Sequence, residues 1–455
     1  MSERLRSVGL DVGTTSTQMI LSELTIENRA SNFAVPEMEI AERKILYKSP
    51  IYFTPLLDES HVDGGGIRAI VEEEYRKAGI RRDSVDTGAI IITGETSRKE
   101  NARAVLDALA DFAGEFVVAT AGPDLESVLA AKGAGAVDFS EQTGKTVLHM
   151  DIGGGTSNLS LICGGKVVRT GCLNVGGRLL KLDKNGTVTY ISPVLDGICD
   201  LKIGDTTTRQ KLEPVAQTLA QALEMAAGLR EETPLLEKLT TAEALEGFRV
   251  TEKAVISFSG GVADCIEREV PWLEFGDIGP VLGQAIRESR LCQGEYMLGS
   301  ETIRATVIGA GCHSAQLSGS TVFYQNVQFP LKNVPVVNIE TLTSIRRELS
   351  RQEGTAVLAM PGTAAPTYRE VVAMAEGILA QTDGQVLLCL EQDMAKALGQ
   401  ALAARLPPQA RVLCIDRVRV SEGSYLDIGA PIGHALPVVV KTLVLGGKEH
   451  AADAV

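Results

Sequence analysis

Two stretches of the chain carry the same order of apolar and polar residues. Residues 147–152 form a mostly apolar run, three glycines follow, and residues 157–162 then alternate between polar and apolar side chains. An apolar run is typical of a buried strand, and alternation is typical of a strand with one buried face. Residues 7–12 and 16–21 likewise combine polar and apolar side chains on either side of a short turn that begins with glycine. The pattern therefore predicts two similar β-hairpins.

The agreement between the two hairpins extends to single positions. An offset of 140 residues places Asp11 on Asp151, and each aspartate lies two residues before the first glycine of its turn. The same offset pairs Val12 with Ile152, Gly13 with Gly153, Ser16 with Thr156, Thr17 with Ser157, Gln18 with Asn158 and Met19 with Leu159. One such hairpin would be interpreted as an ordinary glycine turn between strands. Two matched copies favour a duplicated binding site.

The turns have the chemistry of a phosphate clamp. Glycine lacks a Cβ, so the backbone N–H groups of such a turn can point at an anion. A carboxylate beside a phosphate is repulsive unless a cation lies between them, and Mg²⁺ is the hard cation that binds carboxylates together with phosphates. We therefore expect Asp11 and Asp151 to be metal ligands and catalytic residues. The expected phosphate-binding residues are Gly13, Thr14, Thr15 and Ser16 in the first turn, and Gly153, Gly154, Gly155 and Thr156 in the second.

The paired hairpins resemble the phosphate-1 and phosphate-2 loops of the superfamily of actins, sugar kinases and heat-shock chaperones. This resemblance implies an α/β fold of two duplicated actin-like ATPase domains, ribonuclease-H-like in architecture, with ATP and Mg²⁺ in the cleft between them. It also implies a glycine pair beside the adenosine, after a later strand. Residues 254–259 are an apolar run that leads into Gly260, Gly261 and Val262, where a helix is expected to start. All three motifs occur in the order that the superfamily requires.

The residue that would activate water is not defined by these motifs. Residues 123–132 and 303–313 resemble the two connecting helices at the domain interface, and glycines in the second helix permit close packing. Some members of the superfamily carry a glutamate beside the first helix that orients the attacking water. Here Gly122 stands at the expected position, so Asp124 or Glu126 could take the role. This difference favours slow hydrolysis, as in a molecular switch.

A further carboxylate lies at the junction of a predicted strand and a predicted helix. Residues 88–94 are mostly apolar and predict a buried strand, and residues 95–111 predict a helix. Glu95, at the start of that helix, either caps or packs against it, or lies at the cleft. The first interpretation is preferred, and the second keeps Glu95 among the candidate catalytic residues.

The remaining segments predict inserted subdomains and a third domain. Gly64, Gly65 and Gly66 follow a polar stretch and predict a flexible turn. Strand, helix and strand patterns follow one another after residue 318, as in a β-α-β unit. The expected organisation is an ATPase domain at residues 1–145 with an insertion at about 27–85, a second at 146–318 with an insertion at about 180–250, and a C-terminal α/β domain at 319–455.

Composition excludes several classes of function. The formal net charge is −14 and the sequence pI is 5.0, whereas nucleic-acid and anionic-membrane surfaces need basic patches. Residues 1–6 have no apolar core and do not resemble a signal peptide, and residues 435–445 are too few for a transmembrane helix. The eight cysteines form no Cys-x-x-Cys pair, and the five histidines form no metal-binding spacing. These features predict a cytoplasmic protein with reduced thiols and no histidine metal site.

Three classes within the superfamily compete for this chain. They are a small-molecule kinase, a filament-forming actin relative, and an ATP-driven factor that remodels a partner protein. Blocks outside the ATP motifs resemble the family of ethanolamine ammonia-lyase reactivating factors, namely residues 88–102, 117–136, 172–180, 303–313 and 425–443. The resemblance extends from residue 7 to nearly the end of the chain and favours the third class. A kinase of the sugar-kinase type stays the alternative.

The family resemblance implies a partner as well as a reaction. Ethanolamine ammonia-lyase uses adenosylcobalamin and loses activity when the cobalt–carbon bond breaks irreversibly. A reactivating factor with ATP and Mg²⁺ binds the inactivated lyase, so that damaged cobalamin escapes and adenosylcobalamin enters. The resemblance therefore implies ethanolamine ammonia-lyase as the partner, and the acidic composition predicts that neither nucleic acid nor a membrane is one. The sequence leaves open the oligomeric state and whether the protein enters a bacterial microcompartment.

Overall fold

The computed structural model of the chain describes most of its length. Thr14, Thr15 and Glu95 lie outside the described residues, and so does most of the predicted helix 95–111. The described residues are 3–13, 16–28, 38–58, 61–81, 84–93, 101, 117–120, 123–241, 254–313, 315–317, 321–351, 354–382, 384–418, 420, 424–429, 431 and 436–442.

The first predicted hairpin forms the centre of the first sheet. Its strands are β1 (Glu3–Val12), β2 (Ser16–Asn28), β3 (Met38–Lys48), β4 (Tyr52–Phe53), β5 (Thr87–Ile92) and β6 (Val117–Thr120), in the order β3-β2-β1-β5-β6 with β4 beside β2. β1 is antiparallel to β2 and parallel to β5. The insertion expected at 27–85 therefore includes a strand of the main sheet. β3 has mixed charge because it is an edge strand, and its outward side chains reach solvent.

The second predicted hairpin forms a second sheet of the same topology. Its strands are β7 (Val147–Ile152), β8 (Ser157–Cys163), β9 (Lys166–Leu173), β12 (Val255–Ser259) and β13 (Tyr296–Leu298), in the order β13-β12-β7-β8-β9. The pairing register is also repeated. Asp11 lies opposite Gln18 in the first hairpin, and Asp151 lies opposite Asn158 in the second. The expected duplication of an actin-like α/β domain is confirmed.

Helices cover the outer faces of both sheets. α1 (Gly64–Lys77) packs its buried residues on the first sheet, and α5 (Arg209–Ala226) and α8 (Gly279–Glu288) pack on the second. The second insertion also holds β10 (Leu180–Leu182), β11 (Val188–Ile191) and α6 (Pro234–Leu239). Gly64, Gly65 and Gly66 were expected to form a flexible turn, but they form the first turn of α1. The side chain of Asp63 caps that turn by accepting from the Gly66 N–H at 3.0 Å.

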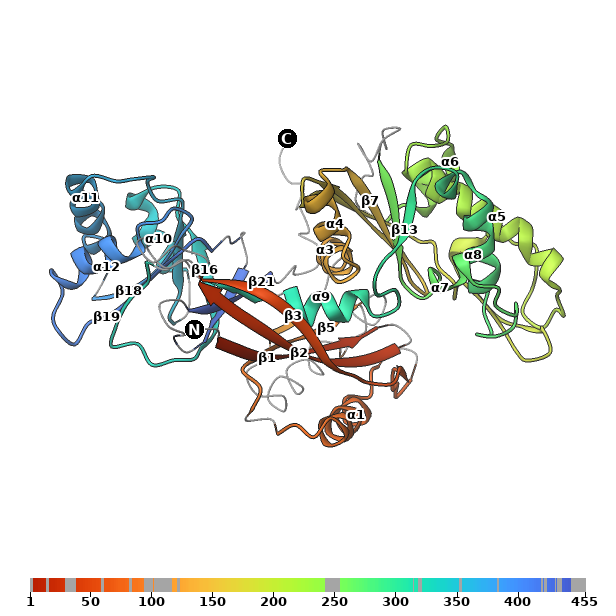
Figure 1. Cartoon of the computed structure of the whole chain (residues 1–455), viewed down its shortest axis with the longest axis horizontal. Helices are drawn as coiled ribbons and strands as arrows, with labels where there is room; N and C mark the ends of the chain where they lie inside the picture. Colours follow the sequence, from red (N-terminus) through yellow and green to blue (C-terminus); the bar gives the residue numbers. More distant parts are fainter. Residues whose placement is uncertain are drawn as a thin grey trace, which may run out of the picture.

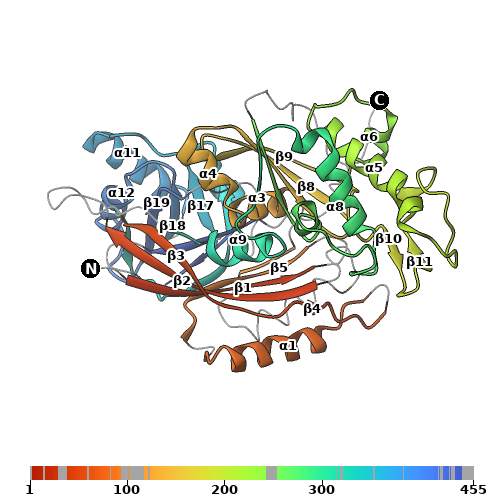
Figure 2. The same cartoon turned by 45° about the vertical axis from the view of Figure 1, so that its right-hand side comes forward.

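Helices α3 (Pro123–Gly133) and α9 (Ala305–His313) cross between the sheets, as Figures 1 and 2 show near the centre of the molecule. α3 and α4 (Ala136–Thr143) pack on the second sheet, whereas α9 packs on the first. Each connecting helix thus covers the sheet of the other half. A Cβ on Gly133 would lie 1.8 Å from the Ala305 carbonyl oxygen, and one on Gly309 would lie 2.0 Å from the Leu129 carbonyl oxygen. The predicted close packing through glycine is confirmed.

The C-terminal part of the chain adds a third sheet beside the first (Figure 1). Its parallel strands β16 to β19 alternate with helices, as the β-α-β pattern predicted. The first strand of this sheet, β14, lies before residue 318 and pairs with β21 near the C-terminus. The elements are β14 (Ala315–Leu317), β15 (Phe323–Gln325), β16 (Leu331–Asn338), α10 (Ile345–Leu349), β17 (Val357–Met360), α11 (Tyr368–Leu379), β18 (Gln385–Leu390), α12 (Ala395–Ala403), β19 (Arg411–Asp416), β20 (Ser424–Ile428) and β21 (Pro437–Thr442).

Within the described residues, no helix has both the length and the apolar character needed to cross a lipid bilayer.

Candidate nucleotide cleft

The two hairpin turns open into one cavity between the first and second sheets. The cavity has a volume of 740 Å³ and is lined from both halves of the duplicated fold. The predicted site residues along its wall are Asp11, Gly13, Ser16, Asp151, Gly153, Gly154, Gly155, Thr156, Gly260, Gly261 and Val262. Three motifs that lie far apart in the sequence therefore meet in one place.

Each turn is closed by the same backbone hydrogen bond. The Gly13 N–H donates to the Ser16 carbonyl oxygen at 2.8 Å, and the Gly153 N–H donates to the Thr156 carbonyl oxygen at 2.9 Å. A Cβ placed on Gly155 would meet no atom of the described residues within 4 Å. The second turn therefore leaves room for a group to approach its backbone closely, as phosphate binding requires.

Both aspartates are buried at the end of a strand and hydrogen-bonded to hydroxyl groups. Thr93 Oγ1 donates to Asp11 Oδ1 at 2.9 Å, and Ser259 Oγ donates to Asp151 Oδ1 at 2.5 Å. Burial raises the pKa of Asp11 to about 7; the Thr93 hydrogen bond opposes this rise and the charge of Asp151 adds to it. Burial raises the pKa of Asp151 to about 6, against the hydrogen bonds from Ser259 and Thr306. Two repelling carboxylates in a buried site favour a cation between them.

Two amide side chains beside these aspartates have unsatisfied oxygens. Gln18 and Asn158 lie opposite Asp11 and Asp151 in the two hairpins, and both line the cavity. Among the residues that the structure describes, their Oε1 and Oδ1 atoms are buried and have no hydrogen-bond partner. Buried polar groups are normally paired, so these two oxygens indicate a ligand or ordered water in the cleft. Carboxylate and amide oxygens are also the ligands that Mg²⁺ prefers, and they accept hydrogen bonds from the waters bound to it.

A buried polar chain extends behind Asp151. His149 Nε2 lies 2.9 Å from Ser259 Oγ, and His149 Nδ1 lies 3.0 Å from Ser257 Oγ. Because Ser259 donates its proton to the carboxylate of Asp151, its oxygen accepts from His149 Nε2–H, and Nδ1 then accepts from Ser257. Burial lowers the pKa of His149 to about 3, so the ring is neutral at physiological pH. The chain fixes the orientation of Asp151.

The third motif is a tight turn packed against the end of β7. Gly260 has φ +86°, and a Cβ there would lie 2.3 Å from the Ile152 carbonyl oxygen. The Val262 N–H donates to that same oxygen at 3.1 Å. The predicted helix after the motif is the single turn α7 (Asp264–Glu267). Glycine is required here because the backbone conformation and the close contact both exclude a side chain.

A segment after β3, which also lines the cleft, supports the first turn. Thr54 Oγ1 donates to the Gly13 carbonyl oxygen at 2.8 Å. Ser49 Oγ accepts from the Met19 N–H at 2.9 Å, while the Ser49 carbonyl oxygen accepts from Arg304 at 2.9 Å. Arg304 immediately precedes α9, so this segment joins the first turn to the connecting helix.

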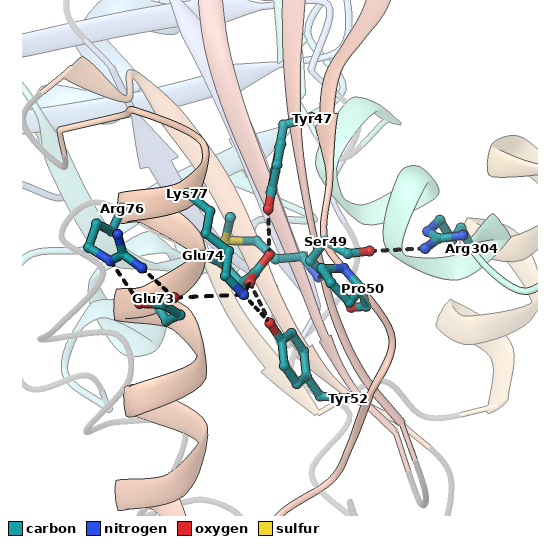
Figure 3. A network of polar contacts seen from close by, with 10 residues as sticks. Tyr47, Ser49, Pro50, Tyr52, Glu73, Glu74, Arg76, Lys77 and Arg304 are labelled. Carbon is teal, nitrogen blue, oxygen red and sulfur yellow. Dashed lines mark hydrogen bonds and ion pairs between the residues drawn. The ribbon is translucent and has the colours of Figure 1, made fainter.

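Figure 3 shows how the same segment is anchored to α1. The fully buried carboxylate of Glu74 accepts from Tyr47 at 2.8 Å, from Tyr52 at 2.5 Å and from Lys77 at 2.9 Å. Burial alone would raise the pKa of Glu74, but these hydrogen bonds outweigh it and hold the pKa below its usual range. The ionised carboxylate therefore fixes β4, whose residue Tyr52 also lines the cleft.

The structure places the remaining predicted residues as follows. Glu126 lines the cavity from α3, whereas Asp124 lies in the first turn of that helix and its side chain is outside the described part. Thr14, Thr15 and Glu95 also lie outside it. Lining or supporting residues absent from the sequence prediction include Gln18, Thr93, Asn158, Arg178, Ser259 and Thr306. The internal repeat could have pointed to Gln18 and Asn158, because it pairs them, but no local signal marks the others.

Comparisons with known proteins match the chain over almost its whole length. The family model for the ethanolamine utilisation protein EutA matches residues 3–446. "Ethanolamine ammonia-lyase reactivase EutA" of Salmonella typhimurium (strain LT2) is 41% identical, covering 97% of this chain and 99% of that protein. The protein of the same name from Escherichia coli (strain K12) is 38% identical, with the same shares covered. Among solved structures, the Aquifex aeolicus PPX-GPPA enzyme has 12% identity and a TM-score of 0.41, covering 68% of this chain and 99% of that one.

Proposed function

The chain belongs to the family of the ethanolamine utilisation protein EutA, and from this premise we propose that it is an ATP- and Mg²⁺-dependent reactivating factor for ethanolamine ammonia-lyase. It would release damaged cobalamin from the inactivated lyase so that adenosylcobalamin can rebind. The observation that carries the ATP-dependent part is the convergence of two matched Asp–Gly turns and the Gly260 turn on one cavity. The names of the curated relatives carry the choice of client.

The residues of the cleft fit a magnesium–nucleotide complex. Asp11 and Asp151 would hold Mg²⁺ through its water shell, and the unsatisfied oxygens of Gln18 and Asn158 are suited to accept from those waters. The turns at Gly13 and Gly153 would bind phosphates through backbone N–H groups. When bound, Mg²⁺ neutralises phosphate charge and orients the transferring group.

The remaining residues of the site would position the nucleotide and water. The turn at Gly260 and Val262 would flank the adenosine. Glu126 is the described carboxylate of α3 that reaches the cavity, and it would orient the attacking water. Nucleotide exchange would then change the angle between the two sheets through α3 and α9, because both helices lie between them.

A reactivation assay tests this proposal. The lyase is first inactivated with cyanocobalamin, then incubated with this protein and adenosylcobalamin, and acetaldehyde release is followed with and without Mg·ATP. We expect recovery that needs both the protein and Mg·ATP. ATP hydrolysis without recovery would exclude this client and redirect the search to small hydroxyl or carboxyl substrates, as the kinase alternative requires. We also propose that this protein is located in the cytoplasm, because it has to meet the lyase there.

A further inference from the structure

Arg178 lies in the cleft, in a segment to which the proposed site gives no role. Its backbone N–H donates to the Gly154 carbonyl oxygen at 2.6 Å, and the Gly177 N–H donates to the Gly153 carbonyl oxygen at 3.0 Å. The segment is therefore fixed directly onto the second phosphate turn. The side chain of Arg178 then runs across Gly154, with its Cδ 3.5 Å from the position of an added Cβ.

The guanidinium of Arg178 crosses the cleft to an aromatic ring. Its Cζ lies 5.8 Å from the centroid of Phe53, which is 80% exposed. Phe53 pairs with Ser16 between β4 and β2, beside the first phosphate turn. An aromatic face holds a guanidinium without neutralising its charge, because the ring is uncharged. Arg178 therefore places a cation between the two phosphate turns.

The charges along the cavity wall give this cation a function. The acidic lining residues are Asp11, Glu126, Asp151, Asp264, Glu269, Glu274 and Asp277, and the basic ones are Arg178, Arg268 and Arg304. A nucleoside triphosphate adds further negative charge to this acidic site, so cations beside its phosphates are needed. Arg268 follows the Gly260 turn, and Arg304 donates to the Ser49 carbonyl oxygen. Of these lining arginines, Arg178 is the one whose side chain lies over a phosphate turn.

The guanidinium is positioned but retains donors for a ligand. Its Nε lies 3.4 Å from Asp277 Oδ2, while Asp277 Oδ1 accepts from the Gly279 N–H at 2.9 Å at the start of α8. Nε is the nitrogen of this ion pair, and a guanidinium carries four further N–H donors on Nη1 and Nη2. The planar fork of an arginine can bind two phosphate oxygens at once with such donors.

We propose that Arg178 is a further ligand for the terminal phosphates of the nucleotide, held in place by Asp277 from one half of the cleft and by Phe53 from the other. This inference rests on the proposed ATP site and adds a residue that distinguishes triphosphate from monophosphate. Asp277 and Phe53 are positioning residues. Because Phe53 belongs to the other half of the cleft, the same contact links phosphate binding to the separation of the two halves.

Calorimetric titrations of Mg·ATP, Mg·ADP and AMP test the proposal with the full-length protein and its R178Q, R178K and R209Q variants. Arg209 is the matched control, because it is an exposed arginine on α5 outside the cavity lining. We expect R178Q to weaken Mg·ATP binding by about tenfold or more, since a charge-assisted hydrogen bond to phosphate is lost, and to weaken AMP binding by less than about twofold. R178K should recover part of the loss, because lysine keeps the charge without the fork.

The outcomes separate this inference from the proposal on which it rests. Wild-type protein that binds no Mg·ATP would overturn the ATP site and this inference together. Wild-type protein that binds Mg·ATP, with R178Q binding it equally well, would overturn the role of Arg178 alone. An equal loss of AMP and Mg·ATP binding in R178Q would also overturn it, because general damage to the cleft does not depend on the number of phosphates.

Discussion

Asp151 is the residue whose surroundings are best defined in the proposed site. It receives hydrogen bonds from Ser259 and Thr306, and the His149 chain fixes Ser259 in turn. Replacement of Asp151 by asparagine keeps the size of the side chain but removes the charge that a metal requires. We expect Mg·ATP-dependent reactivation and ATP hydrolysis to fall at least about tenfold, since metal positioning contributes several kcal/mol to catalysis.

The exposed Asp138 on α4 provides the control for this change. It lies outside the cavity lining, so D138N should keep the wild-type reactivation rate. Wild-type reactivation by D151N would contradict the assignment of the second turn as a phosphate clamp. Measurement of both hydrolysis and reactivation shows whether the nucleotide step or the lyase step is lost.

Asp11 gives a pH-dependent prediction for the free protein. Its pKa is raised from 3.8 to about 7 in the folded state, mainly by burial. The unfolded chain therefore releases this proton at lower pH than the folded one does. The corresponding stability is fully present below pH 3.8 and is lost as the pH rises towards 7. The D11N variant has a neutral side chain at every pH, so its stability should not fall in this way.

Thermal melting without nucleotide or metal tests this sign. The melting temperature of D11N relative to wild type should increase between pH 4.5 and 7.5, by roughly 5 °C or more, and change little above that range. A difference that stays constant across this range would show that Asp11 is ionised at low pH in the folded protein. At pH 7.5, Mg·ATP should also raise the melting temperature of wild type more than that of D11N, because the metal then pairs with the charge of Asp11.

At the level of elements, the crossing of α3 and α9 determines how closely the two halves of the duplicated fold can approach each other. A Cβ on Gly309 would lie 2.0 Å from a backbone carbonyl oxygen of α3, and backbone cannot move aside as a flexible side chain can. We expect G309A to lower the melting temperature by at least about 5 °C, because the two helices must separate. The reactivation activity should fall with it.

Gly294 provides the matched control for the glycine change. It is exposed, and a Cβ there would meet no atom within 4 Å in the part of the chain that the structure describes. G294A should melt within about 2 °C of wild type, as surface substitutions usually do. Equal melting of G309A and wild type would mean that the helices are not in contact at this point.

The same elements show what could be predicted from sequence. The two hairpins were predictable because strand periodicity and glycine turns are local signals, and the repeat links Asp11 to Asp151. The position of β3 in the main sheet was not predictable, because the mixed charge of an edge strand, as at Glu42, Arg43 and Lys44, resembles a short strand of an inserted subdomain. The contact of Thr93 with Asp11 joins positions 82 residues apart, so only the parallel pairing of β1 and β5 reveals it.

At the scale of the whole molecule, the third sheet is separate from the nucleotide cleft. None of the described cavity-lining residues lies beyond Thr306 in the chain, whereas the third sheet is built from residues after 314. β14 and β21 lie against β3 and β6 of the first sheet, so the third domain is attached on the side of that sheet's edges (Figure 1). The cleft does not need this domain for its own residues, and we therefore propose that it contacts the lyase.

A chain of residues 1–313 tests this division of labour. A cut at the predicted boundary of residue 318 would leave β14 without its partner β21, so the cut belongs after α9. We expect the shortened chain to bind Mg·ATP within about threefold of wild type, because every described lining residue is kept, but not to bind or reactivate the lyase. Calorimetry with Mg·ATP tests whether the shortened chain is folded, and a pull-down with inactivated lyase tests whether it binds the lyase. A folded shortened chain that still binds the lyase would move the contact surface to the duplicated core, where α1, α5 and α8 offer the outer faces.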